Sequence, residues 1–178
     1  KNGVSTECDL STISDSVEII ESAVLEEAFK KDDEVCSFVI SSEPLKDAFQ
    51  ELSELQGVSK IFIGVSQNQP NLIFFASGNY GDTSIQFIEK SEIFVDFKCS
   101  VASANWGYLL SSIEVGMKAL WFANETYIRF NSEGMMNVHH QVKVNGMVAY
   151  INFILCAILP EREEGGEQNN YEYSNSEI

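Results

Sequence analysis

The side chains in this sequence that could support catalysis or bind a metal ion are few and scattered. His139 and His140 are adjacent within a segment of strand-like composition. Neighbouring side chains of a strand point to opposite faces of the sheet, so these two rings are not expected to share a metal ion. Asp96, Glu114 and Glu125 fall at the ends of predicted elements without paired spacing. A nuclease needs several acids that converge on metal ions, and nothing in this spacing requires that arrangement.

Sequence motifs for other chemistry are absent too. The chain has no nucleophile elbow, P-loop, zincin motif or Gly-rich dinucleotide loop. Its four cysteines are widely spaced without a CxxC pair, which favours reduced and mostly buried thiols. We therefore predict that the protein is not an enzyme and uses no metal or cofactor. An unrelated α+β enzyme or ligand-binding domain remains an alternative, tested by a metal-dependent activity that Asp96→Ala abolishes.

The charge of the chain is strongly acidic and unevenly distributed. The net charge is −16 over 178 residues, with −7 in residues 1–35, −4 in residues 36–160 and −5 in residues 161–178. This bulk charge argues against a simple nucleic-acid-binding protein, so any DNA contact has to come from a local patch or a partner. Hydrophobic residues make up 44% of the chain, which indicates a globular domain, and no apolar run is long enough to span a membrane.

The elements that position these residues follow one order twice. A strand from residue 35, a helix over residues 42–55 and strands over 60–66, 71–77 and 83–90 form the first set. Ser42 and Pro44 are start signals for the helix, and Gly57 is a stop signal. A strand over 92–100, a helix over about 104–121 and strands over 125–131, 135–144 and 147–159 form the second. We predict an α+β fold of two βαβββ repeats, with two helices packed on one face of a continuous antiparallel sheet.

The hairpin over residues 74–90 contains the candidate functional feature. Gly78 and Gly81 are expected to supply the positive-φ positions of its turn. In the strand that follows, Ile85 and Phe87 alternate with more polar neighbours, as in the outermost strand of a sheet. We expect the free backbone of this strand to pair with a neighbouring subunit. The predicted interface residues are Thr83, Ser84, Ile85, Gln86, Phe87 and Ile88.

The doubled pattern resembles one domain of a eukaryotic sliding clamp. Phe74, Ala76, Ser77, Gly78 and Gly81 match the Phe-x-Ala-Ser-Gly-x-x-Gly stretch that precedes the subunit-pairing strand of proliferating cell nuclear antigen. Within that superfamily the chain is similar to the Rad-one subunits of the nine-one-one DNA-damage checkpoint clamp. Three segments carry this second similarity: SSEPLKDAFQELSE (41–54), FKCS (97–100) and YIRFNSEGMMNVHHQV (127–142). The resemblance covers roughly residues 35–160.

The resemblance implies a division of the chain. Residues 1–10 would be the last strand of a preceding clamp domain, and residues 11–34 an interdomain connector. Residues 35–160 would form the C-terminal clamp domain, and residues 161–178 a disordered acidic tail. Such a connector borders an apolar groove for short client motifs, which here involves Ile19, Ile20, Val24 and Leu25. The residues taken alone favour the other interpretation, in which these side chains only pin the connector to the sheet.

The resemblance also implies a function. Two paralogous subunits would complete a heterotrimeric ring, which a clamp loader places on double-stranded DNA at damage sites in the nucleus. The ring would recruit checkpoint and repair proteins without a membrane partner, and a homotrimeric replication clamp is the alternative. Clamp helices present cations to phosphates, and the candidate DNA-facing residues are Lys46, Lys118, Lys60 and Lys98. Acids share these helices, so a solvated helix face with salt bridges is an equal interpretation of Lys46 and Lys118.

Overall fold

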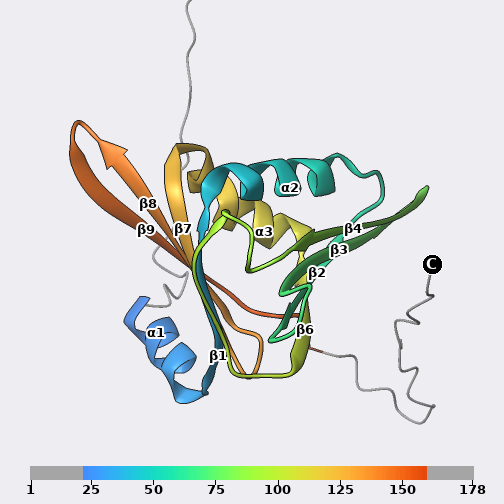
Figure 1. Cartoon of the computed structure of the whole chain (residues 1–178), viewed down its shortest axis with the longest axis horizontal. Helices are drawn as coiled ribbons and strands as arrows, with labels where there is room; N and C mark the ends of the chain where they lie inside the picture. Colours follow the sequence, from blue (N-terminus) through green and yellow to red (C-terminus); the bar gives the residue numbers. More distant parts are fainter. Residues whose placement is uncertain (1–21, 160–178) are drawn as a thin grey trace, which may run out of the picture.

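The computed structural model describes residues 22–159, which form two antiparallel sheets with two helices packed over them (Figure 1). After α1 (Ser22–Lys31), the first repeat contains β1 (Glu34–Ser41), α2 (Ser42–Glu54), β2 (Lys60–Ser66), β3 (Leu72–Gly78) and β4 (Gly81–Phe87). A single strand, β5 (Phe94–Cys99), follows it. The second repeat contains β6 (Ser103–Leu109), α3 (Leu110–Met117), the 3-10 segment η1 (Lys118–Phe122), β7 (Ala123–Asn131), β8 (Met136–Val144) and β9 (Met147–Leu155).

Each repeat contributes its first strand to the sheet of the other repeat. The five-stranded sheet has the order β5-β1-β7-β8-β9, and the four-stranded sheet has the order β4-β3-β2-β6. Strand β1 pairs with β7 of the second repeat, and β6 pairs with β2 of the first. This exchange joins the two halves into one unit. The predicted α+β fold of two βαβββ repeats is confirmed, but the described strands form two sheets rather than a continuous one.

The helix predicted over residues 104–121 is wrong in its first third, where the chain forms β6. Trp106 and Tyr108 point inward and pair across from Ile63 and Ile61 of β2. A short apolar and aromatic run fits both strand and helix periodicity, and here the aromatic content and the pairing partner decide the outcome. The helical part is limited to α3 and η1. The second repeat therefore opens with β6, while the strand predicted over residues 92–100 is the linking strand β5.

Helix α2 carries its apolar residues on one face, as predicted. Leu45, Ala48 and Leu52 are buried against the sheets, and the acids of the helix face solvent. The prediction that Ser42 caps this helix is wrong, because Ser42 is its first residue and no side chain caps it. The Ser42 hydroxyl instead meets the buried Thr126 hydroxyl of β7 at 3.0 Å. The Ser42 hydroxyl therefore bonds to a residue that is remote in the sequence instead of to the backbone amides of its own helix.

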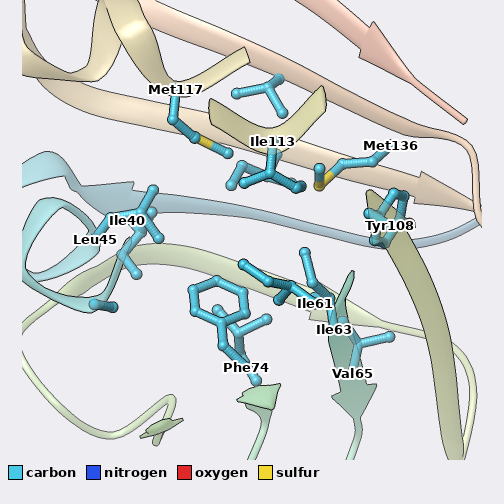
Figure 2. Packing of buried hydrophobic residues seen from close by; sticks show 14 of the residues in the cluster. Ile40, Leu45, Ile61, Ile63, Val65, Phe74, Tyr108, Ile113, Met117 and Met136 are labelled. Atoms are coloured by element: carbon cyan, nitrogen blue, oxygen red, sulfur yellow. The ribbon is translucent and has the colours of Figure 1, made fainter. Parts of the chain in front are cut away.

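The core lies between the two sheets and the helices. Figure 2 shows Ile40 of β1, Leu45 of α2, Phe74 of β3 and Ile113 of α3 converging in this space. Each of these four side chains is at most 1% exposed. Burial of such side chains from every element supplies the main stabilisation, at roughly 25 cal/mol per Å² of apolar surface.

Two of the predicted turns can be judged from backbone conformation. Asn145 and Gly146 both have positive φ, 51° and 81°, as the predicted two-residue hairpin turn requires. In the β3–β4 turn, Gly81 has φ of 150°, but Gly78 does not have positive φ. A Cβ at Gly78 would lie 3.0 Å from the Gln56 carbonyl, so close packing explains this glycine.

Helix α1 packs on the face of the five-stranded sheet that points away from α2 and α3 (Figure 1). Phe29 is 3% exposed, and the Arg129 guanidinium of β7 lies 4.9 Å from the centre of its ring. The Asn131 amide donates to the Phe29 carbonyl at 3.4 Å. The segment predicted as a connector therefore contains a helix that docks on the sheet surface.

Candidate functional site

Strand β4 forms one end of the four-stranded sheet, as predicted. Among residues 22–159 it pairs only with β3, in a register that runs from Gly78↔Gly81 to Leu72↔Phe87. Figure 1 shows the β3–β4 hairpin extending from the body of the domain beneath the end of α2. One side of β4 is therefore open to another polypeptide.

Backbone direction identifies the groups on that open side. The Phe87 carbonyl accepts from the Asn71 amide at 3.1 Å, so Phe87 turns its polar backbone groups toward β3. Successive residues of an antiparallel strand alternate in this direction. Ser84 and Gln86 accordingly direct their N–H and C=O groups away from β3. An added strand would find these groups spaced for hydrogen bonding.

The side chains of β4 separate into an inner and an outer face. Phe87 is 5% exposed and meets the Phe74 ring edge-on, with the two centres 5.4 Å apart. Ile85 is half-buried on the same side, whereas Ser84 and Gln86 are exposed. Ile88 lies just beyond the strand and is also exposed. The six predicted interface residues thus include two, Ile85 and Phe87, that hold the hairpin to the core.

The five-stranded sheet ends in a second open strand. Within the described residues β9 pairs only with β8, from Met136↔Leu155 to Val144↔Met147. Met147 is 68% exposed and Tyr150 is 66% exposed, so this end also presents apolar surface. The end of the four-stranded sheet formed by β6 differs, because the chain after β9 crosses to it. There the Ile158 amide donates to the Gly107 carbonyl at 2.7 Å. The domain therefore presents open strands at β4 and β9.

The helical face brings two of the predicted DNA-facing lysines together. Lys46 of α2 and Lys118 of η1 line one hollow of about 220 Å³, together with Glu114. Lys46 is paired with Glu43 at 3.0 Å, and its side chain is only 14% exposed. Lys118 is exposed, and so is Lys60 at the start of β2. Lys60 lies near α3, because the amide of Leu110, the first residue of α3, donates to the carbonyl of the preceding Ser59. Lys118 and Lys60 are thus the freer cations near the helices.

Lys98 does not lie with the other three lysines. It belongs to β5, where Phe97 stacks on Phe38 of the core at 5.9 Å and Lys98 points to the opposite face. There its ammonium pairs with Asp96 at 3.0 Å. Alternation along the strand therefore places Lys98 on the face that carries α1, and its predicted position near the helices is wrong.

The connector residues are only partly within the described chain. Ile19 and Ile20 lie outside it. Val24 and Leu25 belong to α1, where Val24 is 54% exposed and Leu25 is half-buried. A shallow hollow of about 530 Å³ runs beside the exposed side of this helix, lined by Val24, Glu27, Ala28, Lys30 and Lys31. The helix thus has one docked side and one side open to a partner.

A hollow on the α1 face of the five-stranded sheet gathers acids that the sequence did not bring together. Asp96 and Glu125 line this space of about 410 Å³ with His139, and Tyr127 and Tyr150 complete its sides. Burial, followed by the nearby Arg129 charge, lowers the pKa of His139, which keeps the ring neutral near pH 7. Glu114 lies elsewhere, on α3. Only strand register reveals this cluster, since its residues come from β1, β5, β7, β8 and β9.

The two histidines point to opposite faces, as predicted. His140 is fully buried beneath the helices, where its Nε2 lies 2.9 Å from the Gly116 carbonyl. Across residues 22–159, no group of three or more His, Cys, Asp or Glu side chains is arranged to hold a metal ion. In the same residues no helix is long and apolar enough to cross a membrane.

The fold and its open strands define a class of protein. Two antiparallel sheets that exchange the first strands of two βαβββ repeats, with the helices α2 and α3 of the repeats on one side, form a sliding-clamp domain of the proliferating cell nuclear antigen type. The chain matches the family described as "Repair protein Rad1/Rec1/Rad17" over residues 1–142, and it belongs to that family. Comparison with curated proteins gave no match.

The family membership confirms the resemblance to Rad-one subunits of the checkpoint clamp. The chain is therefore a clamp subunit of the DNA-damage checkpoint, with a DNA-associated role in repair. The predicted strand over residues 1–10 and the predicted disordered tail over residues 161–178 lie outside the described residues. The proposed domain division stays a prediction.

Proposed function

We propose that residues 35–160 are the C-terminal domain of a subunit in a heterotrimeric ring that encircles double-stranded DNA. Two paralogous subunits would complete the ring, and a clamp loader would open and close it around DNA in the nucleus. The ring would hold checkpoint and repair proteins at damage sites. Its contribution is to link proteins to DNA by topology rather than to catalyse a reaction.

The observation that carries this proposal is the open side of β4. A sheet end with unpaired backbone groups favours association with another chain unless a covering segment, a charged side chain, a proline or a bulge prevents pairing. Ser84 and Gln86 are exposed there, while Phe87 anchors the strand from beneath. A neighbouring subunit that adds a strand would continue the four-stranded sheet across the subunit boundary. Strand β9, at one end of the five-stranded sheet, has an open side for a second junction of this kind. A subunit with two such junctions can take part in a closed ring.

The helical face is proposed to line the central hole. Lys118 and Lys60 are available for phosphate contacts, whereas Lys46 is held by Glu43. Five acids lie on the helices of this face, namely Glu43, Asp47, Glu51 and Glu54 on α2 and Glu114 on α3. DNA contact through this subunit is therefore weak and independent of base sequence, and the paralogous subunits would supply most of the positive potential.

The exposed side of α1 is proposed as the client-binding surface. Val24 and the shallow hollow beside it lie on the side of the sheet that faces away from the helices. Proteins docked there would not compete with DNA inside the ring. Arg129 and Asn131 hold the helix in place through Phe29, which gives the surface a fixed position.

The test of the ring proposal is Ser84→Pro, compared with Ser84→Ala. Proline removes one backbone donor from the open side of β4, whereas alanine keeps that donor and removes only the hydroxyl. We expect the proline variant to pair less with its neighbouring subunit in a pull-down, with little change in thermal melting of the domain. The alanine variant should behave as the parent chain.

Three outcomes would contradict the proposal. Undiminished pairing of the Ser84→Pro variant would show that the open side of β4 is not the subunit interface. A homotrimer of the full-length protein, measured by light scattering in the absence of paralogues, would favour a replication clamp instead. A metal-dependent activity lost in Asp96→Ala would contradict the non-catalytic role.

A further inference from the structure

Two of the cysteines that are far apart in the sequence lie directly opposite each other in the five-stranded sheet. Cys36 of β1 pairs with Cys99 of β5 in the antiparallel register. The next pair along the ladder is joined by a hydrogen bond, since the Ser100 amide donates to the Val35 carbonyl at 2.8 Å. Because hydrogen-bonded and non-hydrogen-bonded pairs alternate, Cys36 and Cys99 form a non-hydrogen-bonded pair.

This type of pair has the spacing that a disulfide needs. Opposite residues of a non-hydrogen-bonded pair have Cα atoms about 4.5 Å apart, with their side chains on the same face. Disulfides span Cα separations of about 4.4–6.8 Å. The two thiols are free in this structure. A bond between them would therefore require little movement of either strand.

The two thiols differ in their access to solvent. Cys36 is 2% exposed and belongs to the core, whereas Cys99 is half-buried. Both line a hollow of about 450 Å³ at the end of β1 and β5, with Gln67, Lys98 and other polar groups at its rim. A small reagent can enter such a space. Cys99 is the thiol that it would meet first.

The environment assigns different chemical roles to the two thiols. Burial, followed by the proximity of Cys99, raises the pKa of the Cys36 thiol well above its usual range. Since the thiolate is the reactive form, Cys36 is a poor first nucleophile. The Cys99 thiol contacts the Val101 carbonyl at 3.5 Å, which holds it at the entrance to the hollow.

We propose that Cys36 and Cys99 form a dithiol site that a hydroperoxide oxidises to a cross-strand disulfide. The Cys99 sulfur attacks the peroxide oxygen, which breaks the O–O bond, releases water or an alcohol, and leaves a sulfenic acid. The Cys36 sulfur then attacks the Cys99 sulfur, and the sulfenic oxygen leaves as water with the thiol proton. The peroxide is reduced by two electrons, and the two thiols are oxidised by the same two electrons.

The disulfide would secure a strand that is otherwise held on one side. In the described chain β5 pairs only with β1, and it leads through residues 100–102 into β6 of the other sheet. Gln67 donates to the Cys99 and Val101 carbonyls, so the same strand also contacts the loop after β2. A covalent bond at Cys36 would fasten this junction between the sheets. Closing the long intervening loop should raise the melting temperature.

The test uses the whole chain with Cys8→Ser and Cys156→Ser, which leaves only the opposed pair. Hydrogen peroxide is added, and peptides are mapped by mass spectrometry without reduction. We expect an intramolecular Cys36–Cys99 link, a loss of two hydrogens from the intact mass, and a higher melting temperature that dithiothreitol reverses. The matched control adds Cys99→Ser to the same background and should show neither the link nor the rise in melting temperature.

Three outcomes would overturn the proposal. The first is two intact thiols after a treatment that oxidises the exposed Cys156 of the parent chain. The second is accumulation of Cys99 sulfinic acid beside reduced Cys36, which would mean that the buried thiol cannot reach its partner. The third is a cross-link between two chains in place of the internal one.

Discussion

At the scale of single residues, a buried chain of hydrogen bonds joins both helices to the five-stranded sheet. The Gly116 carbonyl can only accept, so the His140 Nε2 carries the proton that it receives. His140 Nδ1 then accepts from the Thr126 hydroxyl, and the Thr126 oxygen accepts from the Ser42 hydroxyl, each at 3.0 Å. A protonated ring would reverse the two hydroxyl bonds and would place a positive charge in this buried site, so the neutral ring is the form that the fold favours.

The buried histidine in these hydrogen bonds should make the free energy of unfolding depend on pH. Burial lowers the pKa of His140, and the Gly116 carbonyl only partly opposes that effect. The unfolded chain therefore binds a proton first, near pH 6.5 for an ordinary histidine. The stabilisation is fully present above about pH 6.5, and it is lost as the pH falls from there toward the folded pKa. Urea unfolding across this range should show the decline.

Variants separate the contributions of the two histidines. His140→Gln should cost roughly 1–3 kcal/mol at neutral pH, because buried partners lose hydrogen bonds, and should flatten the decline toward acid pH. His139→Gln is the control on the other face of β8. His139 also titrates with a lowered pKa, so part of the decline persists in each single variant. An unchanged decline in His140→Gln would contradict the assignment.

Two glycines at similar backbone angles provide a second prediction. Gly134 has φ of 77° and Gly146 has φ of 81°, so alanine at either site is strained by roughly 1–2 kcal/mol. A Cβ at Gly134 would also overlap the Trp106 ring, whereas a Cβ at Gly146 meets nothing within 4 Å. Gly134→Ala should therefore be the more destabilising by roughly 1–3 kcal/mol in urea unfolding. Equal losses would show that the Trp106 ring moves aside freely.

Single residues also mark the limits of what the sequence predicts. Asn145-Gly146 predicts its own turn, because both residues tolerate positive φ and no distant contact is needed. The role of Gly78 could not be predicted in this way, since the Gln56 carbonyl that crowds it belongs to another loop. Cys36 opposite Cys99, and Asp96 beside Glu125, likewise depend on pairing between strands that are remote in sequence.

At the scale of elements, amphipathic pattern identified α2 and most strands, but it failed at β6. The segment from Ser103 to Leu109 buries Tyr108 and half-buries Trp106 against β2. The partner residues Ile61 and Ile63 are more than forty positions away and belong to the other repeat, so the decisive interaction is tertiary. The open side of β4 was predictable because a Gly-rich hairpin with an outer polar face has the composition of a sheet end.

The docking of α1 yields a prediction about one element. Phe29 is the buried anchor of a ten-residue helix, and a helix of this length has little stability by itself. Phe29→Ala should release α1, so its amides lose protection in hydrogen exchange while those of β7 and β8 keep theirs. Val24→Ala, at a position 54% exposed, is the control and should leave the helix protected. Protected α1 amides in Phe29→Ala would mean that Arg129 and Asn131 hold it without the ring.

At the scale of the whole molecule, the two faces of the sheets have different roles in the proposed ring. The helical face carries α2, α3 and the exposed Lys60 and Lys118, and the other face carries α1 and Lys98. Because the acids on the helices keep the local potential low, we expect few phosphate contacts from this subunit. DNA contact should therefore be measured on the assembled ring rather than on this subunit alone.

Salt dependence tests which face meets DNA. Each phosphate contact steepens the fall of log affinity with log salt by about 0.9, because counterions are released. Lys60→Ala combined with Lys118→Ala removes up to two phosphate contacts. In the assembled clamp this should make the slope shallower by up to about 0.9 for each lost contact. Lys98→Ala removes one positive charge from the opposite face and should leave the slope unchanged. A shallower slope in Lys98→Ala would place DNA on the α1 face, so the ring would have to be oriented the other way. An unchanged slope in the double variant would show that Lys60 and Lys118 make no phosphate contact.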